Sequence, residues 1–294
     1  MSDFNKDKEI KDLVVSIVTH NSLNFLKECL HSILKNPPGV EYEIIVVDNA
    51  SGDGTAEFIR KNYPEVTLIS NSRNIGFAAA NNKAIKKSNS KYLLLINSDC
   101  RVYEKSIDGL VDFMEKNPGA GIAGPKIVNS DGTIQLSCRR FPSIFNAAAH
   151  TILGDIFPHN PFSKKYKLAG IRRDNPLKVD WVSGSCMVIR KKALVEDTGV
   201  LDENYFMYVE DLDICYRMWQ KNWEVYYYPQ AKIMHHVAGS SDGGKIKSSF
   251  RMQKSVFYFF WKNYRKDWRI ILIPLLVPIL GFRLFLTIIK SPFS

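Results

Sequence analysis

The strongest structural signal in this sequence is a regular alternation of short apolar runs and amphipathic stretches between residues 13 and 99. Apolar runs such as LVVSIVTH, YEIIVVDNAS and KYLLLINSD are separated by segments with helical periodicity, such as SLNFLKECLHSILK and GFAAANNKAIKKS. Continuous apolar runs of this kind are typical of parallel strands that are covered on both faces. We therefore predict that the first half is α/β, with a doubly wound, mostly parallel sheet.

Ligands of such sheets bind at the carboxyl ends of the strands, where this chain has several polar side chains. Six residues share that position: Thr19, Asn21, Asp48, Asn49, Asn97 and Asp99. Asp48 can accept hydrogen bonds from a nucleobase or a ribose hydroxyl, or it can simply cap the next helix. Asp99 suits a hard divalent cation, Mg²⁺ or Mn²⁺, unless it is an ordinary turn residue.

The second half has a less regular pattern. We expect a helix near 104–117, a hairpin over 119–137 with the turn NSDG, and a long surface excursion over 139–178. A strand over 179–190, a helix over 208–222, a strand over 223–230 and a basic helix over about 245–266 should follow.

Three carboxylates, Glu210, Asp211 and Asp213, lie close together in the stretch FMYVEDLDICYRM. They can mark a solvated helix start, because acidic side chains are favoured at the N-terminal end of the helix dipole. Alternatively, one of them is a proton acceptor at the rim of a pocket. Asp213 and Arg217 are spaced for an ion pair on one helix face.

Two further segments carry weaker signals. His235 and His236 precede a Gly/Ser-rich loop in HHVAGSS, where one of them could bind a borderline cation such as Mn²⁺ or contact a diphosphate. Arg73 and Asn74 precede a helix start in SRNIGFAAANN, a place that suits an anionic group.

Composition limits the possible partners and the compartment. A net charge of +10 and a pI near 9.2 favour an anionic partner, namely nucleic acid, a phosphorylated small molecule or an acidic membrane. No recognised nucleic-acid-binding module supports the first of these. The five cysteines form no CxxC pair, so we expect reduced thiols in the core of a cytosolic protein. The polar N-terminus gives no sign of a signal peptide. No GxGxxG follows a predicted strand, which argues against a dinucleotide-dependent dehydrogenase, and the absence of GxxxxGK[ST] argues against P-loop enzymes.

Residues 270–289 form an apolar tail that is close to the roughly 20 residues needed to span a bilayer. Arg283 and two prolines interrupt it, so an interfacial or re-entrant helix, or a helix packed on the protein itself, is also open. The basic and aromatic segment 245–269 precedes the tail and favours an anionic membrane surface. We therefore expect a catalytic domain over 1–266 and a membrane-associating tail over 267–294.

Seven blocks occur in a specific order: VSIVTHN, VVDNASGDGT, NSRNIGFAAANN, LLINSD, WVSGSCMVIRKKAL, LDENYFMYVEDLDICYRM and HHVAGSS. Together they resemble the family 2 glycosyltransferases, and most closely the rhamnosyltransferase-like branch that builds bacterial cell-surface polysaccharide. The resemblance covers roughly residues 12–265 and leaves out the apolar tail. It implies a GT-A fold, with a nucleotide-binding half fused to an acceptor-binding half.

The resemblance also implies roles for single residues. Thr19, Asn21 and Asp48 would hold the nucleoside of the donor, with Asn49 and Arg73 nearby. Asp99 would match the last acidic residue of the DxD metal motif, which reads Asn97-Ser98-Asp99 here and so lacks its first carboxylate. His235 would be the additional metal ligand, with His236 as the fallback. Asp211 would be the catalytic base, assisted by Glu210, while Trp181 and Gly184 would shape the acceptor side.

These implications predict an inverting, metal-dependent glycosyltransferase that acts at the cytosolic face of the membrane. It would move a sugar, plausibly rhamnose from dTDP-rhamnose, from a nucleotide-sugar donor to a lipid-linked acceptor. The alternatives are a UDP-hexose-dependent transferase of the same fold and a catalytically silent scaffold in a polysaccharide-assembly complex.

Overall fold

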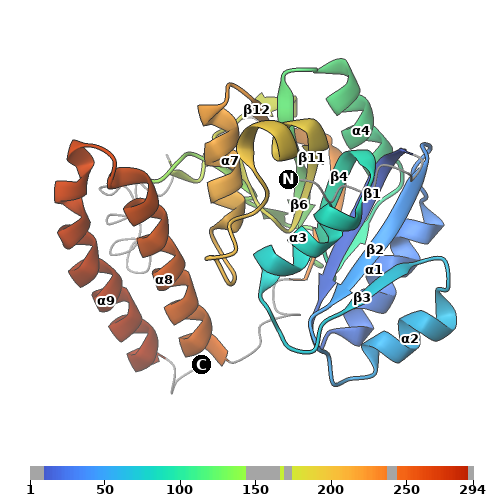
Figure 1. The fold of residues 1–294 in the computed structure, drawn as a ribbon, viewed down its shortest axis with the longest axis horizontal. Coiled ribbons are helices and arrows are strands. Elements are labelled where there is room, and N and C mark those ends of the chain that lie inside the picture. Colours follow the sequence, from blue (N-terminus) through green and yellow to red (C-terminus); the bar gives the residue numbers. More distant parts are fainter. Residues whose placement is uncertain (1–9, 144–165, 169–173, 237–243, 291–294) are drawn as a thin grey trace.

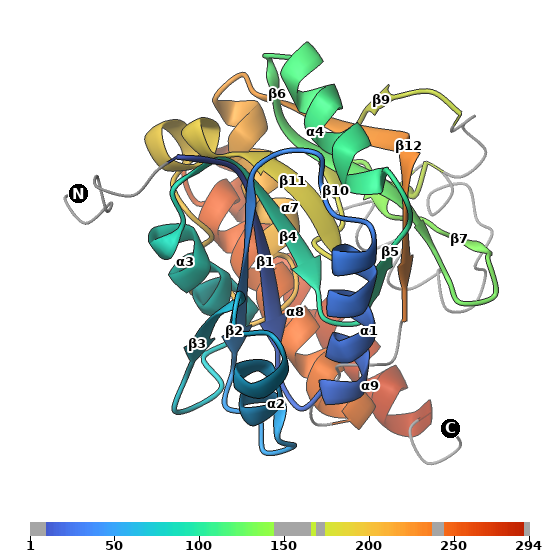
Figure 2. The same ribbon diagram turned by 90° about the vertical axis from the view of Figure 1, so that its right-hand side faces the viewer.

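The structure, a computed structural model, describes residues 10–143, 166–168, 174–236 and 244–290. Within these ranges, ten strands form one twisted sheet in which β3-β2-β1-β4-β11-β6-β12-β5 is the main order (Figures 1 and 2). The predicted α/β class is confirmed. Residues 144–165 and 169–173 of the expected excursion, and 237–241 of HHVAGSS, lie outside the described ranges.

The first half of the sheet is parallel, as predicted. Its strands are β1 (Lys11–Thr19), β2 (Tyr42–Asp48), β3 (Thr67–Ser70) and β4 (Ser90–Asn97). The connecting helices are α1 (Leu23–Lys35), α2 (Thr55–Asn62) and α3 (Phe77–Lys87). Because these strands share one direction, their carboxyl ends lie at one edge of the sheet.

The second half makes the sheet mixed. β11 (Cys186–Arg190) lies antiparallel between β4 and β6 (Ala120–Val128), and β12 (Glu224–His235) runs parallel to β6. β5 (Cys100–Val102) lies antiparallel to the end of β12, which places Cys100 opposite His235. β7 (Ile134–Gln135) forms the predicted hairpin with β6. A second, two-stranded sheet joins β8 (Cys138–Arg139) to β10 (Trp181–Val182), and β9 (Leu177–Lys178) pairs with β12.

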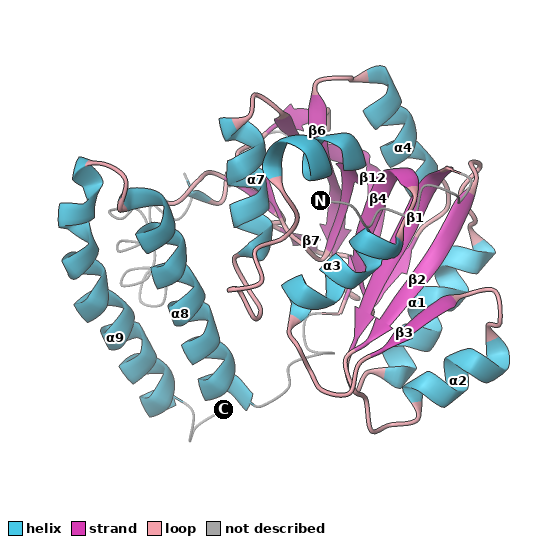
Figure 3. Ribbon diagram, in the orientation of Figure 1, coloured by secondary structure: helices cyan, strands magenta, loops and turns pink. Residues whose placement is uncertain are grey.

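Each face of the large sheet has its own apolar core. Alternate β1 side chains face opposite ways, so Leu13 packs with α1, α2 and α4 (Ser106–Lys116), whereas Val14 packs with α3 and α7 (Glu210–Gln220). All five cysteines are buried and free, which agrees with the predicted core thiols. Figure 3 shows this layered arrangement of helices around the sheet.

Two predicted elements differ from the observed ones, and one observed element was not predicted. The expected strand over 179–190 is divided into β10 and β11, because residues 183–185 leave the ladder to reach the N-terminus of α7. The expected strand over 223–230 continues to His235 after a shift in register between Tyr228 and Lys232. A single π-helical segment, Ala193–Thr198, was not predicted.

The chain ends in a helical hairpin. α8 (Gly244–Tyr264), the predicted basic helix, is followed by a 3₁₀ turn (Trp268–Leu272) and α9 (Ile273–Lys290). Figure 1 shows the two helices side by side, with α9 on the outer side. Ile273, Leu276 and Leu280 of α9 belong to the same core as Phe259 and Phe260 of α8.

Candidate active site

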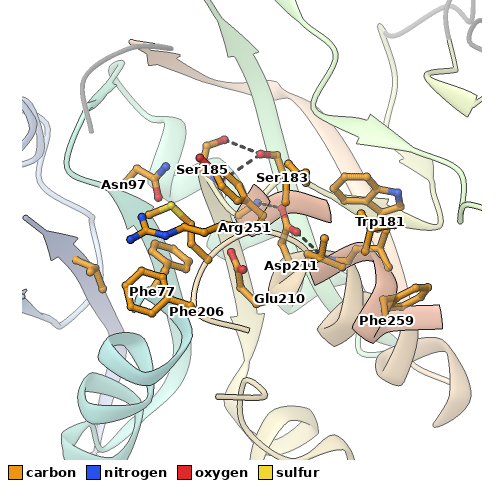
Figure 4. Close-up of a pocket in the computed structure, with 18 of the residues that line it drawn as sticks. Phe77, Asn97, Trp181, Ser183, Ser185, Phe206, Glu210, Asp211, Arg251 and Phe259 are labelled. Carbon is orange, nitrogen blue, oxygen red and sulfur yellow. Dashed lines mark hydrogen bonds between the residues drawn. The ribbon is translucent and has the colours of Figure 1, made fainter. Parts of the chain in front are cut away.

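A cavity of about 460 Å³ opens between the carboxyl ends of the parallel strands, the start of α7 and the α8–α9 hairpin. Nine of the predicted site residues line it: Thr19, Asn49, Asn97, Asp99, Trp181, Gly184, Glu210, Asp211 and His235. Figure 4 shows Asn97 and Trp181 on opposite sides of the cavity, with Glu210 and Asp211 between them. The sequence blocks therefore converge on one site.

The remaining three predicted residues do not line this cavity. Asn21 accepts a hydrogen bond from the Gly52 amide at 2.8 Å, and Asp48 accepts one from the Ser51 amide at 3.1 Å. Both contacts stabilise the loop between β2 and α2. Arg73 is exposed before α3, whereas Asn74 lies at the cavity wall.

Asp99 and His235 form the most compact polar cluster in the cavity. Asp99 lies in the turn between β4 and β5, and His235 ends β12 directly beside that turn. The His235 Nε2 atom is 3.3 Å from Asp99 Oδ1, yet that oxygen has no hydrogen-bond partner among the described residues. His236 points elsewhere: its ring packs against Phe25, and its Nε2 is 3.5 Å from Glu28.

Gln135, which the sequence did not single out, sets the orientation of the His235 ring. Its Nε2 donates to the His235 carbonyl at 2.8 Å and to Asn129 Oδ1 at 2.7 Å, so the amide oxygen must face the ring. That oxygen is 3.1 Å from His235 Nδ1, which therefore carries the proton. The Nε2 lone pair is left directed toward Asn97 and Asp99.

This donor set fits a divalent cation. Two acceptor atoms only 3.3 Å apart need a positive charge between them, and a carboxylate oxygen with an imidazole nitrogen suits Mn²⁺ or Mg²⁺. The nearby Cys100 thiol does not suit such ions, because burial raises its pKa well above the usual range and it donates to the Ser185 carbonyl. Asp99, His235 and the amide oxygen of Asn97 are the residues that could hold the cation.

Asp211 is held firmly at the N-terminus of α7. Its Oδ2 accepts a hydrogen bond from the backbone amide of Gly184, and its Oδ1 accepts one from the backbone amide of Leu212, each at 2.8 Å. A Cβ on Gly184 would lie 3.2 Å from the Asp211 Cβ, so the close approach suits glycine. Burial raises the pKa of Asp211, while these amides and the charge of Arg139 oppose the shift. The result is an oriented carboxylate with increased basicity.

Glu210 has a different environment. It is buried, and its Oε2 has no hydrogen-bond partner among the described residues. Burial, followed by the charge of Asp211, raises the pKa of Glu210 well above its ordinary value. Of the two carboxyl groups, Glu210 is therefore the one that retains a proton while Asp211 ionises.

A strained turn brings these carboxyl groups to the cavity. Tyr208 and Val209 both adopt positive φ angles, 71° and 72°, which are costly for bulky and β-branched residues. Phe206, two residues before Tyr208, is anchored by its carbonyl, which accepts a hydrogen bond from the Phe77 backbone amide at 2.7 Å. Gly76 permits this contact, since a Cβ there would lie 2.5 Å from the Phe206 carbonyl oxygen.

The third carboxylate, Asp213, is structural. It is fully buried and forms the predicted ion pair with Arg217 at 2.8 Å. Lys262 of α8 also lies 2.7 Å from Asp213 and 2.7 Å from Asp202. This network joins α8 to α7, a contact that sequence spacing could not predict because it crosses 49 residues.

Several cavity residues were missed by the sequence analysis. The most notable are three arginines: Arg139 of β8, Arg251 of α8 and Arg283 of α9. The Arg139 guanidinium lies over the Trp181 ring, 5.0 Å from its centroid, and that of Arg251 lies 4.6 Å from the Phe206 centroid. The only available signal was their basic charge, which the sequence shares among 40 Lys and Arg residues.

Comparisons with known proteins agree with this geometry. The sequence model of glycosyl transferase family 2 matches residues 14–196. An N-acetylglucosaminyl-diphospho-decaprenol L-rhamnosyltransferase of Mycobacterium tuberculosis is 31% identical over 77% of this chain and 76% of its own length. Rhamnosyltransferase WbbL of Escherichia coli is 25% identical over 76% of this chain and 83% of its own length.

Solved structures show the same fold. GalNAc-T7 with UDP, GalNAc and Mn²⁺ matches with a TM-score of 0.60 and 18% identity, over 88% of this chain and 50% of that chain. Mannosyltransferase PcManGT from Pyrobaculum calidifontis with GDP-Man and Mn²⁺ matches with a TM-score of 0.59 and 15% identity, over 94% and 74%. The predicted GT-A fold is confirmed.

Proposed function

The chain belongs to glycosyl transferase family 2, and we propose that it transfers rhamnose from dTDP-rhamnose to a lipid-linked saccharide at the cytosolic face of the membrane. The rhamnosyltransferases among its relatives support the choice of sugar, and the name of the mycobacterial enzyme supports a diphospho-lipid acceptor. The observation that carries the proposal is Asp211, a doubly held carboxylate in the same cavity as the Asp99–His235 pair.

The reaction needs one base. Asp211 takes the proton from an acceptor hydroxyl, whose oxygen then attacks the anomeric carbon of the donor sugar. The bond between that carbon and the donor diphosphate breaks, the nucleoside diphosphate leaves with the electron pair, and the configuration at the carbon inverts. Glu210, which keeps its proton, donates a hydrogen bond to the acceptor and does not compete for the transferred proton.

The donor would bind on the Asn97 side of the cavity, across from Trp181. Thr19 and Asn49 at the ends of β1 and β2 would contact the nucleoside, while Asp99 and His235 would hold a Mg²⁺ or Mn²⁺ ion. Such a cation supplies charge neutralisation for the leaving diphosphate, which can then leave without protonation. Asn49 is pre-oriented, because its Oδ1 accepts a hydrogen bond from the side-chain Nδ2 of Asn71 at 2.7 Å and its own Nδ2 donates to the Gly76 carbonyl.

Membrane contact would come from the hairpin. By length and composition, the stretch Trp268–Ile289 could cross a bilayer, and its mean hydropathy is 2.3. Leu280 and Arg283 within it line the cavity, so one face of α9 is turned to the protein. We propose that α9 lies at the membrane surface and does not span it.

The test uses full-length protein in detergent with a short-chain N-acetylglucosaminyl diphospho-prenol and a panel of nucleotide sugars. Mass spectrometry should detect addition of one deoxyhexose with dTDP-rhamnose and Mn²⁺, and far slower product formation by Asp211→Asn. Product formed only with a UDP-hexose would establish the alternative donor. Intact donor binding without product from any sugar would instead support a silent scaffold.

A further inference from the structure

Two of the cavity arginines lie on the Trp181 side, away from Asn97. Arg139 lies in β8 and lines the cavity. Its guanidinium is 5.0 Å from the Trp181 ring centroid and 5.9 Å from the Tyr166 ring centroid. The charge of Arg139 opposes the rise that burial causes in the pKa of Asp211. Arg139 therefore acts on the carboxylate that meets the acceptor hydroxyl, and both residues line the same cavity.

Arg283 reaches the same region from the far end of the chain. It lies three residues after Leu280 on α9, so both side chains lie on the helix face that lines the cavity. Its charge acts on Tyr166 and Lys167, as that of Arg139 does. The two arginines, more than a hundred residues apart in sequence, thus converge around Tyr166.

The charge of Arg139 acts on the Asp211 carboxylate without an ion pair between the two side chains. Among the described residues, no carboxylate lies within ion-pair distance of Arg139 or Arg283. Burial, and then the charges of both arginines, lower the pKa of Lys167. Two guanidinium groups at a cavity wall form a favourable site for an anion with more than one charge.

The surroundings of Arg283 identify the kind of anion. The cavity wall between α8 and α9 is apolar, with Val256, Phe259, Phe260 and Leu280. On the outer side of α9, Phe282 and Phe285 are 43% and 55% exposed. The cavity therefore combines a base, two guanidinium groups and an apolar wall.

We propose that Arg139 and Arg283 bind the diphosphate of a polyprenyl-type lipid acceptor. The acceptor sugar then lies against Trp181 with its hydroxyl at Asp211, and the first isoprenoid units follow the apolar wall of α8 and α9. This assignment rests on the proposed function and adds the chemical group by which the acceptor is recognised. It also accounts for α9, which lies outside the family match to residues 14–196.

The donor diphosphate is the competing ligand for these cations. It belongs on the Asn97 side, where Asp99 and His235 lie, and Figure 4 shows Trp181 across the cavity from Asn97. The two diphosphates can therefore be distinguished by which substrate a variant affects.

The experiment compares two acceptors with full-length protein in detergent: a short-chain N-acetylglucosaminyl diphospho-prenol and an alkyl N-acetylglucosaminide without phosphate. Arg283→Gln should lower kcat/KM for the diphosphate acceptor by roughly 10- to 100-fold, the range for a lost charge-assisted hydrogen bond. Its rate on the alkyl glycoside and its affinity for dTDP should stay within about twofold of wild type. Arg265→Gln, the same change at an exposed arginine that does not line the cavity, should match wild type on both acceptors.

A binding measurement without catalysis keeps this inference separate from the proposed function. Titration with a short-chain prenyl diphosphate that carries no sugar should show saturable binding, about 10-fold or more weaker in Arg283→Gln. Inorganic pyrophosphate should bind more weakly than the prenyl diphosphate, because it gains nothing from the apolar wall. If neither acceptor reacts but this binding is observed, the proposed function fails and the anion site stands. Equal loss on both acceptors, weaker dTDP binding, or unchanged prenyl diphosphate binding in Arg283→Gln would overturn the assignment.

Discussion

Replacing Gln135 by Leu should weaken Mn²⁺ binding by roughly 10- to 100-fold, although Gln135 does not itself contact the cation site. The reason lies in one contact, the 3.1 Å hydrogen bond between Gln135 Oε1 and His235 Nδ1. Without it, the imidazole can rotate or place its proton on Nε2, and either change removes the lone pair that faces Asp99. The expected loss corresponds to about 1.4 to 2.7 kcal/mol of binding free energy.

The assay is isothermal titration of the full-length protein with Mn²⁺, checked by the loss of the free-ion electron paramagnetic resonance signal. Gln135→Glu keeps an acceptor opposite Nδ1, so it should retain more affinity than Gln135→Leu. Gln230→Leu is the matched control. Gln230 lies on β12, the strand that carries His235, but it donates a hydrogen bond to the Asp174 carbonyl, away from the cavity. Wild-type Mn²⁺ affinity in Gln135→Leu would refute the assigned tautomer and the role of His235.

Four further outcomes follow from the same structure. Asp211→Asn should lower the transfer rate by roughly 10²- to 10⁴-fold with donor affinity unchanged in a binding titration, because only the proton acceptor is lost. Glu210→Gln should raise the melting temperature at pH 7 but not at pH 4. Folding raises the pKa of Glu210, so the contribution of its protonated form to stability is complete below the pKa of about 4.3 in the unfolded chain. That contribution is lost as pH rises through the pKa in the folded protein. Lys262→Met should cost about 3 kcal/mol of unfolding free energy in a denaturant titration, since buried Asp213 loses one partner but keeps Arg217, and the Asp213→Asn background should reduce this cost. The full-length protein should sediment with anionic vesicles at low salt, and Trp268→Ser, which changes a side chain on a residue that is 71% exposed, should weaken this binding; sedimentation equal to wild type would argue against a membrane contact there.

The parallel half of the fold was predictable because its signal is local. Buried strands such as β2 and β4 are continuous apolar runs, and each ends in the polar residues that the topology then brings together. The cavity positions of Asn49 and Asp99 follow directly from that rule, because parallel strands end at one edge. Asp48 ends β2 directly before Asn49, yet it faces the Ser51 amide, since successive residues of an extended chain point to opposite sides.

The rest of the site depends on contacts between distant segments. Gln135 meets His235 only because β7 and β5 flank the ends of β6 and β12, and nothing in the sequence around Gln135 indicates this. Arg283 looked like an interruption in an apolar tail, but the packing of α9 turns it toward the cavity. The positive φ angles of Tyr208 and Val209 were equally hidden, because neither residue type favours that conformation.

The configuration of the new glycosidic bond tests the central claim most directly. If Asp211 acts as a base in a single displacement, the product made from dTDP-rhamnose and the lipid-linked acceptor must have the anomeric configuration opposite to that of the donor. Nuclear magnetic resonance of the purified product gives this configuration from the one-bond carbon–proton coupling at the anomeric position. Inversion by the wild-type enzyme, with a rate roughly 10²- to 10⁴-fold lower in Asp211→Asn, is the result that we predict. Retention of the donor configuration, or inversion at an undiminished rate in Asp211→Asn, would contradict the account.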